Sequence, residues 1–182
     1  FVSRGLGDVY KRQLYNNMLQ SLFDSQIKSL GFVMLIIATM FLILFKSIAL
    51  MVIGIVPNLI SALLVLGIMG IMKLPLDMMT ITIAAITVGI AVDNSIHYIY
   101  RFKEELKNCG NYEQTILICH STIGKAIFFT GITVIFGFSI LILSNFIPTI
   151  IFGVLTGFAM LVALIAVLTL LPRMLITLKP IK

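Results

Sequence analysis

The sequence MMTITIAAITVGIAVDNSIHYIY, from Met78 to Tyr100, decides what kind of protein this is. Its length and apolar character match a helix that crosses a lipid bilayer, which needs about 20 residues. The same stretch carries Asp93 and, one helical turn later, His97. A charged carboxylate at the centre of a membrane helix costs about 3 kcal/mol on insertion scales, so such residues are rare and usually functional. We therefore predict that Asp93 binds and releases a proton; the alternative is a structural carboxylate paired within a helix bundle.

The composition of the whole chain is that of a membrane protein. Of its 182 residues 60% are hydrophobic and 11% are charged, and the mean hydropathy is +1.14. A soluble domain has only about 45–50% apolar residues. Backbone groups in lipid must be paired within helices or in a closed barrel, and the apolar runs here are unbroken for too long to be barrel strands. We predict an all-α membrane protein.

Five apolar segments predict a bundle of five transmembrane helices within residues 29–175. Their expected limits are 30–45, 48–72, 78–100, 126–144 and 149–171. Residues 101–125 are expected to form a cytoplasmic, amphipathic linker along the membrane face, in two helical pieces broken near Gly110. Asn111 has capping-box spacing for the second piece. Residues 14–28 should lead into the first span from the extracytoplasmic side, and residues 176–182 should form a cytoplasmic tail.

The first 13 residues are expected to be foreign to the natural protein. The segment SRGLGDVYKRQ, Ser3 to Gln13, resembles the translation of an adapter used in transposon-based sequencing libraries. Such segments are left out of fold reasoning. The alternative is a genuine basic leader, although it lacks the apolar core of a secretory signal peptide. We expect the natural chain to start near Leu14, as the tail of a longer reading frame.

The basic residues favour one orientation in the membrane. The loops alternate between two sides, and once residues 1–13 are set aside one side holds most of the positive charge. These residues are Lys46, Arg101, Lys103, Lys107, Lys125, Arg173, Lys179 and Lys182, against Lys28 and Lys73 on the other side. By the positive-inside rule, the richer side faces the cytoplasm. We expect the natural amino-terminal end outside and the carboxyl terminus in the cytoplasm.

A stripe of small and polar residues runs along the third predicted span. Residues four apart lie on nearly one face of a helix, and Ala85, Gly89, Asp93 and His97 follow this spacing. Small residues let a second membrane helix approach closely. We therefore expect Asp93 to point into the bundle rather than toward lipid. His97 fits either a proton-relay partner or a solvated residue at the membrane interface.

Other spans carry weaker signals. Pro57 should kink the second span, and Asn58 needs a hydrogen-bond partner, so a hinge is one interpretation and simple structural tolerance is the other. Gly153 and Gly157 have the G-x-x-x-G spacing of helix packing, which is also common by chance. Thr130 offers a hydroxyl in the fourth span, unless it only bonds back to its own helix.

No motif for enzymatic chemistry is found in the sequence. It has no nucleotide-binding loop, metal signature or nucleophile elbow. Cys109 and Cys119 lack metal-ligand spacing. We expect a protein that is not an enzyme, with no metal or organic cofactor and no nucleic-acid partner, and with the proton as its coupling ion.

Several motifs together resemble the resistance-nodulation-division (RND) superfamily. In chain order they are FDSQIKSL (Phe23–Leu30), VPNLI (Val56–Ile60), GIMGIMKLPLDMMT (Gly67–Thr80), GIAVDNSIHYIYRFKEEL (Gly89–Leu106) and LLPRML (Leu170–Leu175). The likeness is strongest to the hydrophobe and amphiphile exporters related to the mycobacterial-lipid (MmpL) transporters and to Patched. It covers the chain from Leu14 onward and implies the last five helices of the second half of a transporter.

The resemblance implies a proton antiporter of the bacterial inner membrane that exports lipids or other hydrophobic or amphiphilic molecules. Its implied partners are the missing amino-terminal half, membrane lipids, the substrate and further copies of the protein. Asp93 occupies the family's proton-binding position, and Thr130 falls where a neighbouring helix of related exporters adds a polar residue to the relay. Asn94 departs from the pattern, because many relatives have a second acid or a tyrosine there.

Two other functions share parts of this pattern. The SecD/SecF protein-translocation motor has a similar G-x-A-V-D core, although the sequence after Asp93 fits it less well. A lipid sensor of the sterol-sensing type uses the same five-helix unit without transport, and the carboxylate argues weakly against it.

Overall fold

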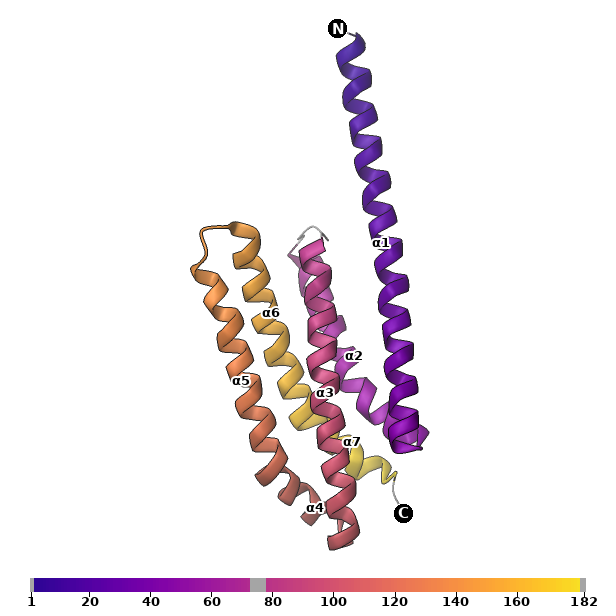
Figure 1. Cartoon of the computed structure of the whole chain (residues 1–182), viewed down its shortest axis with the longest axis vertical. Coiled ribbons are helices and arrows are strands. Elements are labelled where there is room, and N and C mark those ends of the chain that lie inside the picture. Colours follow the sequence, from indigo (N-terminus) through magenta and orange to yellow (C-terminus); the bar gives the residue numbers. More distant parts are fainter. Residues whose placement is uncertain (1, 73–77, 181–182) are drawn as a thin grey trace. The chain divides into compact units, whose positions relative to one another are not determined.

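The computed structural model describes residues 2–72 and 78–180. For residues 78–81 and for several residues before Gly31, it describes only the backbone. The described backbone is helical almost throughout and contains no strand (Figure 1). This confirms the prediction of an all-α membrane bundle.

The described part of the chain holds seven α-helices and three distorted helical turns. The α-helices are α1 (Val2–Phe45), α2 (Ile48–Ile71), α3 (Met78–Cys109), α4 (Tyr112–Cys119), α5 (Lys125–Ser139), α6 (Ile147–Ile165) and α7 (Leu171–Leu178). The distorted turns are two π-helical segments, η1 (His120–Gly124) and η3 (Ala166–Leu170), and one 3₁₀ segment, η2 (Ile140–Leu143). Because these turns do not interrupt the helices, residues 112–143 and 147–178 each form one continuous rod.

The chain divides into two compact units, Phe1–Ile36 and Ile37–Lys182. The first unit is the amino-terminal part of α1, a single helix that includes the adapter-like segment. The foreign origin of that segment stays a prediction. The second unit holds the end of α1 and all the other helices.

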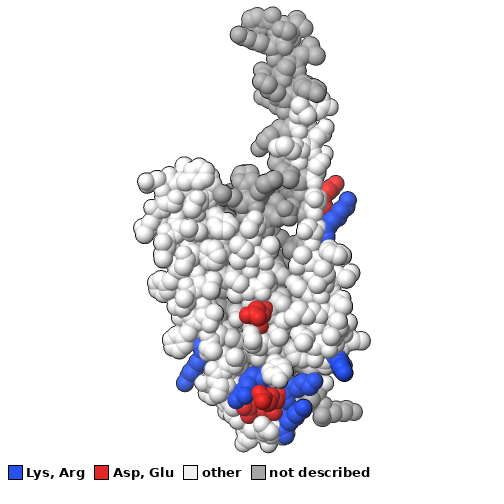
Figure 2. Space-filling model, in the orientation of Figure 1, with Lys and Arg blue, Asp and Glu red and all other residues white. Residues whose placement is uncertain are grey.

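Four helices of the described chain are long and apolar enough to cross a membrane. They are Ile48–Ile71, Thr82–Cys109, Tyr112–Leu143 and Ile147–Leu178, and Gly31–Phe45 is a shorter apolar helix. Charged side chains gather at one end of the bundle, around the end of α3, and leave a wide uncharged surface beyond them (Figure 2). Four long spans and one shorter apolar helix thus stand where the sequence predicts five spans.

The connection between α3 and α4 agrees with the sequence in one respect and differs in another. The helix breaks at Gly110, whose φ of 66° favours glycine, and the Asn111 side chain caps α4 by accepting a hydrogen bond from the Glu113 N–H at 3.0 Å. The first piece of the expected linker, residues 101–109, is the last part of α3. Residues 112–125 run directly into α5, because η1 keeps the helix continuous.

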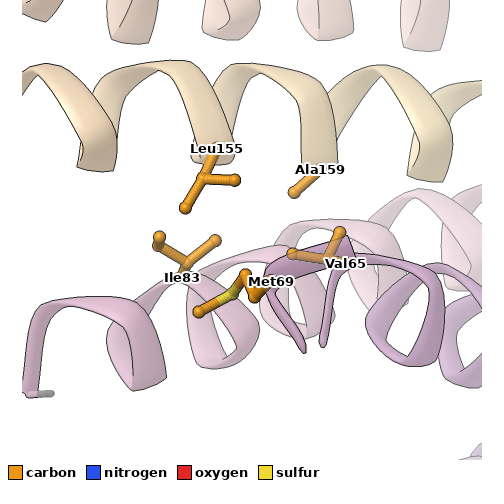
Figure 3. Close-up of a cluster of buried hydrophobic side chains, with 5 residues drawn as sticks. All are labelled: Val65, Met69, Ile83, Leu155 and Ala159. Atoms are coloured by element: carbon orange, nitrogen blue, oxygen red, sulfur yellow. The ribbon is translucent and has the colours of Figure 1, made fainter. Parts of the chain in front are cut away.

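The core lies where α2, α3 and α6 meet. Val65 and Met69 from α2 pack against Ile83 of α3 and against Leu155 and Ala159 of α6 (Figure 3). All five side chains are at least 95% buried. Close contacts of this kind hold membrane helices together, since lipid is as apolar as the side chains themselves. The core fixes one face of α3 toward its neighbours.

Candidate functional site

Asp93 and His97 lie side by side on α3. Their side chains are 3.5 Å apart, from Nε2 of His97 to Oδ1 of Asp93, because residues four apart are neighbours on a helix. They are 68% and 62% exposed. Among the described residues between 47 and 100, Asp93 is the only one of the types Asp, Glu, Lys or Arg. Figure 2 shows an isolated acidic spot on the uncharged surface, apart from the charges at the end of the bundle.

The expectation that Asp93 points into the bundle is wrong for this chain. Ala85 and Gly89 are exposed together with Asp93 and His97, and a Cβ placed on Gly89 would meet nothing within 4 Å. The reason is that the opposite face of α3 packs against α2 and α6. Within the part of the chain that is described, the small residues of the stripe therefore make no close helix contact.

Ser95 is a polar residue of α3 that does face the interior. Its hydroxyl lies 3.3 Å from Nδ2 and 3.4 Å from Oδ1 of Asn58 on α2, and donates to the Ala91 carbonyl at 2.9 Å. The Asn58 amide also donates to the Gly54 carbonyl at 2.8 Å. Asn58 thus has the partners that its burial requires. Sequence reasoning missed Ser95, although a polar residue two positions after Asp93 must lie on nearly the opposite face.

Pro57 and Asn94 are sequence neighbours of the residues just described: Pro57 precedes Asn58, and Asn94 follows Asp93. Pro57 is buried in α2 and its carbonyl accepts a hydrogen bond from Ser61 at 2.9 Å. The helix runs through Pro57 without interruption, and the hinge stays a prediction. Asn94 is half-buried between the exposed Asp93 and the buried Ser95.

Thr130 lies on an exposed face of α5. Its neighbour Thr133 donates to the Phe129 carbonyl at 2.9 Å, as membrane threonines commonly do. Helix α5 packs mainly against α6, whereas α3 packs against α2 and α6. In the described contacts no hydrogen bond joins Thr130 to Asp93, so their place in one relay stays a proposal.

The glycines of α6 lie at its contact with α5. A Cβ placed on Gly153 would lie 2.8 Å from the Phe138 carbonyl oxygen and from Cβ of Leu141, whereas one on Gly157 would lie 3.8 Å from Oγ of Ser139. The close approach of the two helices therefore depends on Gly153 more than on Gly157.

The chemistry available on α3 is proton exchange. A carboxylate and an imidazole 3.5 Å apart can exchange a proton once a small movement brings them within hydrogen-bond distance or one water molecule joins them. Among the described residues no three of the types His, Cys, Asp and Glu lie close enough to hold a metal ion.

Comparison with known proteins gives a family match over nearly the whole chain. The model of the MMPL family matches residues 12–179, nearly the whole chain. The chain belongs to the MMPL family. The predicted resemblance to RND and MmpL-like membrane domains is thereby confirmed.

Two relatives of this MMPL chain have names that describe them as predicted membrane proteins. YdgH of Bacillus subtilis is 36% identical over 150 residues, which cover 79% of this chain and 17% of YdgH. MJ1562 of Methanocaldococcus jannaschii is 29% identical over 120 residues, which cover 66% of this chain and 31% of MJ1562. The chain thus spans less than a third of the length of these curated relatives. No solved structure matches it.

Proposed function

We propose that this chain is the proton-binding membrane portion of a longer exporter, which uses the proton motive force to move lipids or other hydrophobic or amphiphilic molecules across the bacterial inner membrane. The observation that carries the proposal is the lone carboxylate of Asp93 beside His97 on an exposed face of α3. Membership of the MMPL family supports the same function.

Protonation is the step that the site can control. A charged Asp93 on a membrane helix is costly unless water or polar groups surround it, and a proton removes the charge. Two conformations that differ in the access of water to Asp93 would therefore differ in proton affinity, and a proton gradient could drive the exchange between them. His97, Thr130 and Asn94 are the proposed relay residues around Asp93, and Pro57 with Asn58 is the proposed hinge.

The rest of a longer protein is proposed to cover the exposed stripe. Ala85 and Gly89 leave room for a second helix, and a charged carboxylate that faced lipid would be costly with only His97 beside it. The length of the relatives leaves ample sequence for such a second helix bundle. Further copies of the protein, membrane lipids and the exported molecule are the other proposed partners, with the natural amino-terminal end outside and the carboxyl terminus in the cytoplasm.

The test is substrate-dependent proton flux through the full-length protein in proteoliposomes that contain a pH-sensitive dye. Asp93→Asn should abolish the flux, whereas Ala85→Ser, two turns away on the same stripe, should keep most of it. The unfolding temperature of each variant is the check that its fold is intact. Unchanged flux in Asp93→Asn would exclude Asp93 as the proton carrier. Lipid binding by the wild type without any flux would favour a sensor.

A further inference from the structure

A chain of hydrogen bonds joins three helical segments through His120. The hydroxyl of Tyr98 on α3 lies 2.8 Å from Nδ1 of His120, the first residue of η1. Nε2 of His120 lies 3.1 Å from the carbonyl oxygen of Leu168 in η3. The rings of Tyr98 and His120 also meet edge to face, with centroids 5.8 Å apart. One side chain thus bridges α3, the α4–α5 rod and the α6–α7 rod.

The acceptor at Leu168 has a cause in the sequence. In an α-helix the carbonyl of Leu168 would accept the N–H of the residue four positions later, and that residue is Pro172, which has none. The surrounding turn is widened, so that the N–H of Leu171 bonds to the Ala166 carbonyl five residues before it. The Leu168 carbonyl is therefore available to an outside donor, and His120 supplies one.

The partners fix the protonation state of the bridge. A carbonyl can only accept, so Nε2 of His120 carries a proton and donates it to Leu168. In the neutral ring Nδ1 then has a free lone pair, and Tyr98 donates its hydroxyl proton to it. Tyr98 is 0% exposed, so no water replaces a lost partner of its hydroxyl, whereas His120 is exposed.

We propose that Tyr98, His120 and Leu168 form a proton-sensitive latch, which holds α3 against the two π-distorted helices while His120 is neutral and weakens when His120 is protonated. A protonated ring has no acceptor at Nδ1, so Tyr98 can no longer donate to it. A buried donor left without a partner costs free energy. Histidine is the side chain that commonly serves as a proton switch near neutral pH, so acidification is the perturbation that tests the latch.

The hydrogen-bond partners of His120 are the Tyr98 hydroxyl and the Leu168 carbonyl, not a charged side chain. The titratable or charged groups close in sequence to the residues of this bridge are Tyr98, Arg101 and Glu105 on α3, Cys119 and Lys125 on its own helix, and Arg173 on α7. Arg101 is paired with Glu104 at 2.9 Å and with Glu105 at 2.6 Å. Cys119 is a buried free thiol. Tyr98 is the group of this set that is hydrogen-bonded to the imidazole.

The latch would act on the proposed proton site, because Tyr98 and Asp93 are five residues apart on the same helix. This part rests on the proposed function, whereas the latch itself does not. Tyr98 faces the interior and Asp93 faces outward, so the latch positions the helix that carries the carboxylate without touching the carboxylate.

The experiment measures thermal unfolding of the full-length protein in detergent between pH 5.5 and 8, with Tyr98→Phe, His120→Phe and His120→Gln. The unfolding temperature of the wild type should fall on acidification, and Tyr98→Phe and His120→Phe should each make that fall smaller, by at most about 2–4 °C. The double variant, Tyr98→Phe with His120→Phe, should show the same pH dependence of the unfolding temperature as either single variant. Glutamine can both donate to Leu168 and accept from Tyr98, so His120→Gln should keep the stability while losing its pH dependence.

A spectroscopic measurement tests the same latch independently of folding. In ¹⁵N spectra of histidine-labelled protein, the signals absent from His120→Gln should show an Nε2–H tautomer at pH 8. An Nδ1–H tautomer, or a Tyr98→Phe variant with the wild-type pH profile, would overturn the latch. If these variants lose the pH dependence of the unfolding temperature but keep the wild-type proton flux, the latch is supported and only its proposed effect on Asp93 is excluded.

Discussion

Asp93 and Ser95 are two residues apart on α3 and lie on opposite faces of it. The side chain of Asp93 is 68% exposed, whereas Ser95 is fully buried and hydrogen-bonded to Asn58 of α2. The two faces of α3 therefore have different roles. Ser95 ties α3 to its own bundle, and Asp93 is presented to whatever lies outside it.

The pair Asn58 and Ser95 should show a measurable coupling. Asn58→Ala and Ser95→Ala remove the hydrogen bond between α2 and α3, and the double variant should be less destabilised than the sum of the two by about 0.6 kcal/mol, the average for such bonds between membrane helices. The free energy of unfolding in a denaturing detergent measures this. Asn58→Ala combined with Thr87→Ala serves as the control, because Thr87 bonds to the Ile83 carbonyl of its own helix. Coupling as large in the control would contradict the assignment.

A methyl group at Gly54 should be destabilising. A Cβ there would overlap the ring of the fully buried Phe41, whose Cζ would be only 2.8 Å away. Overpacking of this kind costs about 1–3 kcal/mol. Gly54→Ala should therefore lower the unfolding temperature, while Gly67→Ala on the same helix, where the Cβ would meet nothing within 4 Å, should not. Phe41→Leu should recover part of the loss in Gly54→Ala.

The two glycines of the G-x-x-x-G motif should respond differently to alanine. Gly153→Ala would push a methyl group against the Phe138 carbonyl, which belongs to the backbone and cannot rotate away. Gly157→Ala would make only an ordinary contact with Ser139. Thermal unfolding should show a loss of about 1–3 kcal/mol for Gly153→Ala and little change for Gly157→Ala. Equal losses at both positions would show that the glycines act through backbone flexibility rather than through close packing.

Thr156→Val should raise stability. Thr156 is fully buried, and among the described residues its hydroxyl has no hydrogen-bond partner. A buried hydroxyl without a partner costs about 1–3 kcal/mol, so valine, which has nearly the same shape, should be more stable by about 1 kcal/mol. Thr87→Val, which removes a hydroxyl that does donate to Ile83, is the matched comparison. A loss of stability in Thr156→Val would point to a bound water molecule at this hydroxyl.

Much of the fold could be predicted because the backbone hydrogen bonds of a membrane helix join residues that are close in the sequence. The break at Gly110 with its cap at Asn111 follows from short-range spacing and backbone chemistry, and so do the limits of α2. The continuous rod through η1 was not predictable in the same way, since the polar residues of 112–125 look like a separate surface helix. Their helix is extended by packing of Thr115 and Cys119, which are both fully buried.

The sequence by itself determined the class of the protein, its membership of the MMPL family and the position of Asp93 within an apolar segment of membrane-spanning length. Tertiary structure decided which face of each helix is covered. Lipid and protein interior are equally apolar, so hydropathy does not tell a side chain that faces lipid from one that faces another helix. For that reason the sequence shows the stripe through Asp93, but it does not show that the stripe faces away from the other helices. The bridge through His120 joins residues 22 and 48 positions apart, and only folding brings them together.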